Sequence, residues 1–322
     1  MFPTHRMRRL RKSENVRRLV RETGFSIDRL VYPLIVVPGM GKAEPIPSMP
    51  DVYRFSVDRL MDEIRSLVQL GIRAVLLYGI PEAKDEEGSE AYSPAGTVQR
   101  AVRAIKHLIP ELVVITDVCL CQYTTHGHCG IFEAGSVQND ATVEILQRVA
   151  ISHAQAGADF VAPSSMMDGQ VAALREALDR DYFEEVGIVS VSARYASAYD
   201  TPLYQAVDAV VADDDRRAYQ MDPANAFEAL REAALDIEEG ADAIMVQPAL
   251  PYLDVIRRLK EAYQMPVAAY STGGEYAMIK AAAQKGWIDE KQAVLENVQA
   301  MRRAGADWIV TFHAKAIAQW LA

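Results

Sequence analysis

The sequence contains only three cysteines among 322 residues, few aromatic residues (8%) and no long apolar run. No stretch approaches the roughly 18 consecutive apolar residues that a membrane span requires, and the first residues show no apolar signal segment. The formal net charge is -10, which argues against nucleic acid as a main partner, because phosphate contacts need a basic surface. The composition is otherwise that of an ordinary globular protein, so we expect a cytoplasmic protein that acts on a small molecule.

The three cysteines, Cys119, Cys121 and Cys129, all fall within one short segment. Three thiolates on one loop suit zinc and leave a fourth coordination position open to water or substrate, which is the arrangement of a catalytic site. A chance cluster and a disulfide with one thiol left over are the alternatives. The disulfide is disfavoured because a Cys-x-Cys pair is poorly placed to bridge itself and nothing else indicates an oxidising compartment. The segment therefore predicts a Zn2+ site.

Short β-branched segments alternate with amphipathic helical patterns along nearly the whole chain. The expected strands are 30–37, 74–79, 113–118, 160–163, 188–192, 243–247, 266–271 and 308–313. The expected helices are 57–70, 97–108, 141–156, 171–178, 223–239, 252–263 and 290–304. Three of these helices lead into the phrase Gly-Ala-Asp at Gly157, Gly240 and Gly305, where glycine suits a left-handed helix cap.

Eight strand-then-helix units with nearly continuous apolar strands imply parallel pairing, so we predict a single (β/α)8 TIM barrel over residues 29–322. A doubly wound open sheet is the alternative. It is weakened because the glycines after the first strand, Gly39 and Gly41, lead into the stretch 44–47 (Glu-Pro-Ile-Pro) and not into a helix. Residues 1–28 form an N-terminal arm with a basic stretch. Nucleic acid or membrane binding is one interpretation of it, but a solvated or subunit-gripping arm is favoured because the segment is short and its apolar face is weak.

In a barrel of this kind the active-site groups sit where strands end in loops. Asp117 and the cysteine segment follow the third expected strand directly, which favours a zinc ion that lines the site. The other strand ends offer Tyr78, Ser164, Arg194, Gln247, Tyr270 with Ser271, and Phe312 with His313.

Seven stretches of the chain carry a specific pattern: 44–50, 85–92, 115–121, 125–130, 219–225, 248–254 and 274–280. Through them the chain is identified as a member of the porphobilinogen synthase family, also called 5-aminolevulinate dehydratase, over essentially its full length. The resemblance implies a barrel, a catalytic zinc on the three cysteines, and an arm that holds a homo-octamer together. It also suggests an allosteric Mg2+ near Glu232, as in some bacterial relatives; an exposed glutamate on a helix face is the alternative.

Five positions depart from the family pattern, and two of them are the reactive lysines. The family joins two molecules of 5-aminolevulinate into a pyrrole through imines on two lysines, and those positions hold Arg194 and Gln247 here. Arginine keeps its proton and a carboxamide nitrogen is not nucleophilic, so neither side chain can form the imine. Substrate-carboxylate contacts of the family have changed at Tyr204, Gly273 and Phe312, so we expect a divergent member.

Our favoured hypothesis is a zinc enzyme repurposed for a metal-assisted condensation or dehydration of an amino-ketone, amino-acid or keto-acid substrate in specialised metabolism. Arg194 would hold a carboxylate and Gln247 would orient a carbonyl or amine. Asp117 and His313 would act as acid and base, since a histidine that titrates near neutrality suits proton transfer. The remaining residues of the predicted site are Ser164, Tyr270 and Arg216, the last of which matches a lid arginine of the family.

Each assignment has a structural alternative. Arg194 could serve only to pair with a carboxylate such as Asp117, Gln247 could fill the space of a lysine, and His313 could be a surface residue of the last loop. A catalytically silent paralogue that regulates a true synthase or a pathway partner is the second hypothesis. The third is an active porphobilinogen synthase with a relocated amine, for which Lys315 is the nearest lysine.

Overall fold

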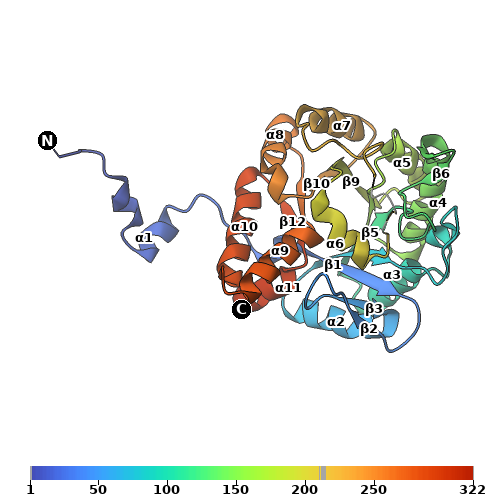
Figure 1. Ribbon diagram of the computed structural model, residues 1–322, viewed down its shortest axis with the longest axis horizontal. Coiled ribbons are helices and arrows are strands. Elements are labelled where there is room, and N and C mark those ends of the chain that lie inside the picture. The colour runs from blue at the N-terminus through green and yellow to red at the C-terminus, as the bar shows by residue number, and fades with distance from the viewer. Residues whose placement is uncertain (1, 210, 212–214, 322) are drawn as a thin grey trace.

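The computed structural model describes residues 2–209, 211 and 215–321, and its centre is a closed barrel of eight parallel strands (Figure 1). The barrel strands are β1 (Leu30–Val37), β4 (Ala74–Gly79), β5 (Val113–Val118), β8 (Phe160–Pro163), β9 (Gly187–Arg194), β10 (Ala243–Gln247), β11 (Val267–Ser271) and β12 (Trp308–Thr311). They pair in chain order, and Leu30 of β1 aligns with Ile309 of β12 to close the ring. The predicted (β/α)8 barrel is confirmed.

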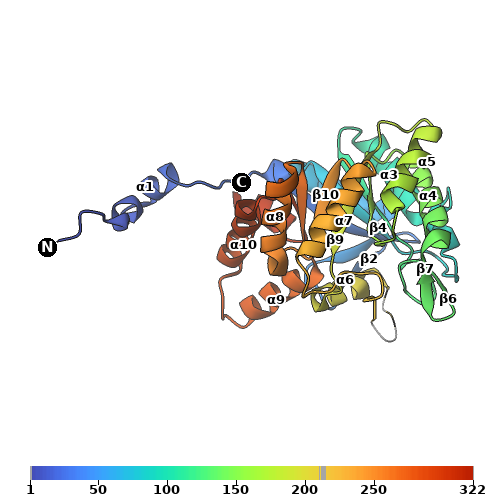
Figure 2. The same ribbon diagram turned by 90° about the horizontal axis from the view of Figure 1, so that it is seen from above.

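Helices surround the barrel as an outer layer (Figure 1). They are α2 (Val57–Gln69), α3 (Thr97–Leu108), α4 (Asn139–Ala156), α5 (Gln170–Arg180), α7 (Phe227–Glu238), α8 (Leu253–Tyr263), α10 (Glu290–Ala304) and α11 (Ala314–Leu321). Other elements lie outside this repeat: α6 (Thr201–Ala206), α9 (Gly273–Gln284), β2 (Ala43–Pro45), β3 (Tyr53–Ser56), β6 (Ile131–Glu133), β7 (Ser136–Gln138), and the 3-10 turns η2 (Ile27–Arg29), η3 (Ser89–Tyr92), η4 (Ala198–Asp200) and η5 (Leu250–Tyr252). Figure 2 shows α6, α9 and the β6–β7 hairpin together on one side of the barrel.

The strands are apolar on both faces because each face is buried in a different core. Leu34 and Val36 of β1 pack outward in the same cluster as Leu60 of α2. Val31 and Ile35, which alternate with them, point into the barrel interior. Since successive strand residues face opposite sides, a strand buried on both reads as a continuous apolar run.

The N-terminal rim of the barrel repeats one local arrangement three times. Gly157, Gly240 and Gly305 each have a φ above 100°, as expected for glycines that end helices. The aspartate two residues later accepts a hydrogen bond from a backbone N–H of the preceding barrel strand. These bonds join Asp159 to Val114 N (2.7 Å), Asp242 to Ile188 N (2.7 Å) and Asp307 to Val267 N (2.9 Å). Each phrase therefore ends a helix and anchors the start of a neighbouring strand.

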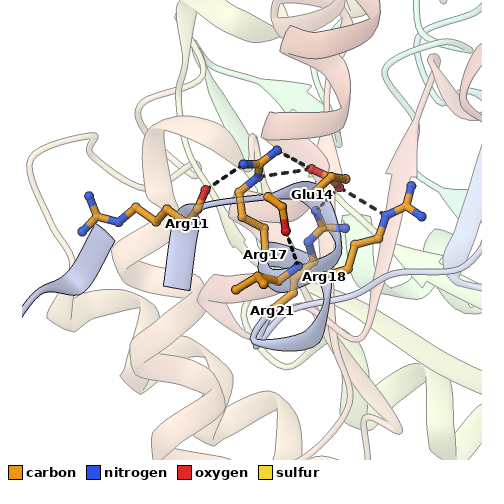
Figure 3. Close-up of polar contacts among 7 residues, drawn as sticks. Arg11, Glu14, Arg17, Arg18 and Arg21 are labelled. Atoms are coloured by element: carbon orange, nitrogen blue, oxygen red, sulfur yellow. Dashed lines mark hydrogen bonds and ion pairs between the residues drawn. The ribbon is translucent and has the colours of Figure 1, made fainter. Parts of the chain in front are cut away.

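The N-terminal arm projects away from the barrel (Figures 1 and 2). Its elements are η1 (Met7–Arg11) and α1 (Glu14–Leu19), in which no residue is buried. Glu14 accepts hydrogen bonds from Arg17, Arg18 and Arg21 (Figure 3). Bonds to Arg17 lower the pKa of Glu14. The arm is held together by local pairs of this kind, and its role in oligomerisation stays a prediction.

Candidate active site

The predicted site residues are gathered at the C-terminal ends of the strands. Asp117 lies in β5, Arg194 ends β9, Gln247 ends β10 and Tyr270 lies in β11. Ser164 follows β8 directly. All five are buried, so a ligand at this rim would meet them away from bulk water.

Within the described part of the chain, every helix is too short or too polar to span a membrane.

The three cysteines form a compact group of buried, free thiols. Their sulfur atoms all lie within 4.8 Å of one another, and Cys119 Sγ is 3.4 Å from Cys121 Sγ. Thiolates bound to one zinc at about 2.3 Å lie roughly 3.8 Å apart in tetrahedral geometry, so the spacing fits this metal. Hydrogen bonds from Cys119 and Cys121 hold the pKa of Cys129 well below its usual range, which favours one thiolate in the trio.

Asp117 stands beside this group with both carboxylate oxygens occupied. Ser164 Oγ donates to Oδ1 at 2.6 Å, and Gln122 Nε2 donates to Oδ2 at 2.7 Å. Burial, and then the neighbouring Cys119, raise the pKa of Asp117 to about 7, against the opposing effects of Ser164 and Arg194. A carboxyl group with this pKa can both take up and release a proton at neutral pH. Gln122 was missed in the sequence, where nothing distinguishes it from a loop residue.

Arg194 is 4% exposed and is held from two sides. Its Nη1 donates to the carbonyl of Ser164, and its Nη2 donates to the Tyr204 hydroxyl at 3.4 Å. Its Nε has no hydrogen-bond partner. Both Arg194 and Asp117 are described, and no ion pair joins them, so the structural alternative of a simple Asp117 partner is not supported.

Gln247 contacts a residue that the sequence analysis did not identify. Its Nε2 donates to Asp200 Oδ2 at 3.1 Å. Asp200 is fully buried in the turn between β9 and α6, and its other oxygen, Oδ1, has no hydrogen-bond partner. Gln247 therefore does more than fill the space of a lysine, because it holds a buried carboxylate.

Tyr270 is buried and interacts electrostatically with both carboxylates. Burial raises its pKa, the neighbouring Tyr78 hydroxyl acts to lower it, and the charges of Asp200 and Asp117 add to the effect of burial. The side chain thus connects the Asp117 group electrostatically with the Gln247–Asp200 pair.

The segment that includes α6 and residues 215–221 covers the site. Arg216 lies with its guanidinium carbon 3.7 Å from the centre of the Tyr204 ring and donates to Gly127 O at 3.0 Å. The Tyr219 hydroxyl is 3.1 Å from His128 Nδ1 and accepts a bond from Cys129 N at 3.4 Å. The cover is therefore joined to the cysteine loop. Part of this segment, residues 210 and 212–214, lies outside the described residues.

The environment of His313 fits neither of its two interpretations, an acid-base group that titrates near neutrality or a surface residue of the last loop. It is 2% exposed, so it is not a surface residue. Burial, and then the charge of Lys280, lower its pKa to about 3, so the structure does not support a base that titrates near neutrality. Its ring faces Tyr276 at 4.3 Å, and both ring nitrogens lack hydrogen-bond partners. Sequence position alone placed His313 in the site, because it follows β12.

None of the nine lysines, all of which lie in the described part of the chain, replaces the missing amines. Lys315 pairs with Glu63 of α2 at 2.7 Å, in the outer layer of the barrel. Lys84 pairs with Asp208 at 2.8 Å, and Lys280 pairs with Asp51 at 2.8 Å. A relocated amine at Lys315 therefore has no structural support.

Glu232 of α7, the residue considered for Mg2+, is half-buried rather than exposed. Burial, and then the neighbouring acids Asp236, Asp168 and Glu228, raise its pKa. Magnesium at this position stays a prediction.

The fold and the placement of these groups define a (β/α)8-barrel enzyme with its reactive side chains at the C-terminal rim. A family model described as delta-aminolevulinic acid dehydratase matches residues 4–320. The delta-aminolevulinic acid dehydratase of Synechococcus elongatus is 52% identical over 100% of both chains, and that of Bacillus subtilis is 49% identical over 99% of this chain and 98% of its own length. The chain belongs to the delta-aminolevulinic acid dehydratase family.

A solved structure is similar along nearly the whole chain. The crystal structure of delta-aminolevulinic acid dehydratase (porphobilinogen synthase) from Toxoplasma gondii, in complex with the reaction product porphobilinogen, has a TM-score of 0.96 and 43% identity. The match covers 99% of this chain and 92% of that one. The expectation of a divergent member is not confirmed, because identity is about one half over the full length of the bacterial relatives. Arg194 and Gln247 nevertheless stand at the two positions where lysines were expected.

Proposed function

We propose that this protein is a dehydratase-type lyase that acts on amino-keto acids of the 5-aminolevulinate class without forming an imine. Membership of the dehydratase family supports the substrate class. The imine-free reaction is inferred from the ends of β9 and β10, which hold Arg194 and Gln247, while every lysine of the chain lies elsewhere. The reaction is a condensation with loss of water, the chemistry for which two adjoining groups of polar side chains and a metal site are suited.

Zinc is proposed as the cofactor, held by Cys119, Cys121 and Cys129. The donor set fits, because three soft sulfur ligands on one buried loop leave a fourth position for substrate. When bound, the ion would polarise a carbonyl or hydroxyl oxygen and lower the pKa of a bound water.

The chain's own residues would bind the substrate and move its protons. Arg194 is the group for a substrate carboxylate, since a guanidinium matches a carboxylate with paired N–H donors. Loss of water requires a proton to leave carbon and another to reach the departing hydroxyl. Asp117, with a pKa of about 7, can accept the first at a carboxylate oxygen and supply the second, and Ser164 keeps it oriented.

The formation of porphobilinogen itself is a second candidate, favoured by identity of about one half to curated dehydratases over their full length. It would require the carbonyl to be activated by hydrogen bonds and metal in place of an imine. A homo-oligomer assembled through the arm is part of either proposal, and exposed Phe2, Met7 and Leu10 support it.

The test supplies purified, zinc-loaded protein with 5-aminolevulinate. Pyrrole would be measured colorimetrically, all condensation products by mass spectrometry, and any imine by borohydride trapping. We expect a dehydrated condensation product and no borohydride adduct, with pyrrole as the product if the second candidate is correct. A lysine adduct on the protein would refute the imine-free reaction, and absence of any product from amino-keto acids would indicate a silent paralogue.

Cys121→Ser tests the metal in the same assay. Loss of one of three sulfur ligands should reduce bound zinc from about one ion per chain to below roughly a tenth, together with loss of turnover. Full turnover in a zinc-free variant would contradict the proposed cofactor.

A further inference from the structure

Two oppositely charged side chains are buried in the site, each with one unpaired polar atom. Arg194 leaves its Nε–H without an acceptor, and Asp200 leaves Oδ1 without a donor. Buried charged groups are normally fully hydrogen-bonded, because an unmatched one loses its solvation without compensation. An unpaired donor on a cation and an unpaired acceptor on an anion in the same site point to a ligand that carries the complementary groups.

Asp200 is not explained by a structural role in its own segment. It is the N-cap residue of α6, a position where a carboxylate usually accepts a bond from the first turn of the helix. Its side chain makes no such bond. The carboxylate instead receives Gln247 Nε2 through Oδ2, which fixes its orientation and leaves Oδ1 available.

Asp200 also belongs to the same electrostatic group as Arg194. Burial raises the pKa of Asp200, and the guanidinium, followed by Thr272 and Gln247, acts against it. The Thr272 hydroxyl donates to Tyr199 O at 3.0 Å, so it does not occupy Asp200 Oδ1. The Tyr270 hydroxyl, which lies beside Tyr78, also feels the charge of Asp200. Both Arg194 and Asp200 are described residues, and they do not form an ion pair with each other. Neither charged group is therefore neutralised by a direct ion pair with the other.

We propose that Asp200, oriented by Gln247, accepts the protonated amine of the substrate, while Arg194 receives its carboxylate. This inference rests on the proposed function and adds to it a residue that determines specificity. An ammonium group offers three N–H donors, for which Asp200 Oδ1 and the Tyr270 hydroxyl are acceptors. A ligand with one ammonium and one carboxylate adds no net charge to the buried site. The substrate amine is thus recognised as a free cation.

Three probes separate the two ends of the ligand: 5-aminolevulinate has both charges, levulinate lacks the amine, and 1-aminobutan-2-one lacks the carboxylate. Binding to the zinc-loaded protein would be measured by calorimetry. We expect the wild type to bind 5-aminolevulinate at least about tenfold more tightly than levulinate, the effect of one hydrogen bond to a charged group.

Asp200→Asn should remove this preference, with affinity for 5-aminolevulinate falling about tenfold and affinity for levulinate changing by less than about twofold. Arg194→Gln should weaken levulinate and leave 1-aminobutan-2-one nearly unchanged. Asp254→Asn, which changes an exposed carboxylate of α8, is the matched control and should alter none of the three affinities.

Equal weakening of all three probes by Asp200→Asn would show a structural role and overturn the inference. A wild type that binds levulinate as tightly as 5-aminolevulinate would overturn it without any variant, so poor folding of Asp200→Asn does not prevent the test. Binding discrimination without turnover would uphold the inference and count against the proposed function, whereas turnover without discrimination would do the reverse.

Discussion

The two rims of the barrel treat their carboxylates differently. At the N-terminal rim, Asp159, Asp242 and Asp307 each accept a backbone N–H of a neighbouring strand. At the C-terminal rim, Asp117 and Asp200 accept hydrogen bonds from side chains, and Asp200 keeps one oxygen, Oδ1, unpaired.

The contrast concerns carboxylates alone, because Arg302 Nε and Trp308 Nε1 near the first rim are also unpaired. It teaches that the first rim is arranged for stability and the second for binding, as the barrel architecture leads one to expect.

The largest effect should come from breaking the N-terminal rim. Asp307→Ala removes a 2.9 Å bond to Val267 N and a 2.7 Å bond to Lys260 Nζ. We expect a loss of about 3 kcal/mol in the free energy of unfolding, since bonds to charged groups contribute about 1.5–3 kcal/mol each and these are partly exposed. Urea unfolding measures this loss.

The control for that measurement is Asp254→Ala, whose carboxylate lies on the exposed face of α8 and should change stability by less than about 0.5 kcal/mol. Ligand affinity should survive Asp307→Ala. A variant as stable as the wild type would show that the aspartates do not anchor the strands.

An effect that is small near neutral pH and grows as the pH falls is expected at His313 near the C-terminal rim. Burial lowers its pKa to about 3, so between about pH 6.5 and 3 the unfolded chain binds a proton that the folded chain does not. Stability is fully present above this window and is lost as the pH falls through it, by up to about 1.4 kcal/mol per pH unit.

His313→Phe should therefore become steadily more stable relative to the wild type as the pH falls from 6.5 towards 4. Unfolding in urea at several pH values measures the difference. His107→Phe, which replaces an exposed histidine of α3, is the matched control. A pH-independent difference for His313→Phe would contradict the neutral, buried imidazole.

The smallest effect on stability should follow Tyr270→Phe. The variant removes a buried hydroxyl that interacts with the Tyr78 hydroxyl but has no close, well-aligned hydrogen bond, so the free energy of unfolding should fall by less than about 1 kcal/mol. Tyr195→Phe is the contrasting control, because the Tyr195 hydroxyl donates to Asn225 O at 2.9 Å and its removal should cost about 1 kcal/mol. Equal losses in the two variants would mean that the contact of Tyr270 with Tyr78 is as strong as the Tyr195 hydrogen bond.

Much of the barrel could be predicted because its strands are buried on both faces. The bounds of β1, β4, β5, β8 and β10 agree with the apolar runs of the sequence. β9 extends to Arg194, beyond the predicted end, because a charged residue at the rim breaks the apolar pattern without ending the strand. Periodicity therefore identifies a strand better than it places the last residue, which is the one that faces the site.

Two of the helices that were not predicted, α9 and α6, lack that periodic pattern. α9 begins with Gly273 and Gly274, which are poor helix formers, although Thr272 and Glu275 form a capping box that is recognisable in the sequence. α6 spans only Thr201–Ala206 and is too short for a helical period to be recognised. Both lie beyond strand ends, where function and not repeat geometry determines the chain.

The site was predictable where it depends on strand ends alone. Asp117, Ser164 and the cysteines came together because parallel strands bring their C-terminal ends to one rim. Asp200 and Gln122 were not predictable, since their contacts depend on how loops fold back. His313 was misread for the same reason: residue order places it after β12, but packing against Tyr276 determines its environment.

The cover is attached to the rest of the site at two separate points. Asp200 accepts a hydrogen bond from Gln247 at the end of β10, and Tyr219 contacts His128 and Cys129 of the cysteine loop. A change in the cysteine loop would therefore be felt at the second attachment point, although that loop is remote in sequence from the cover.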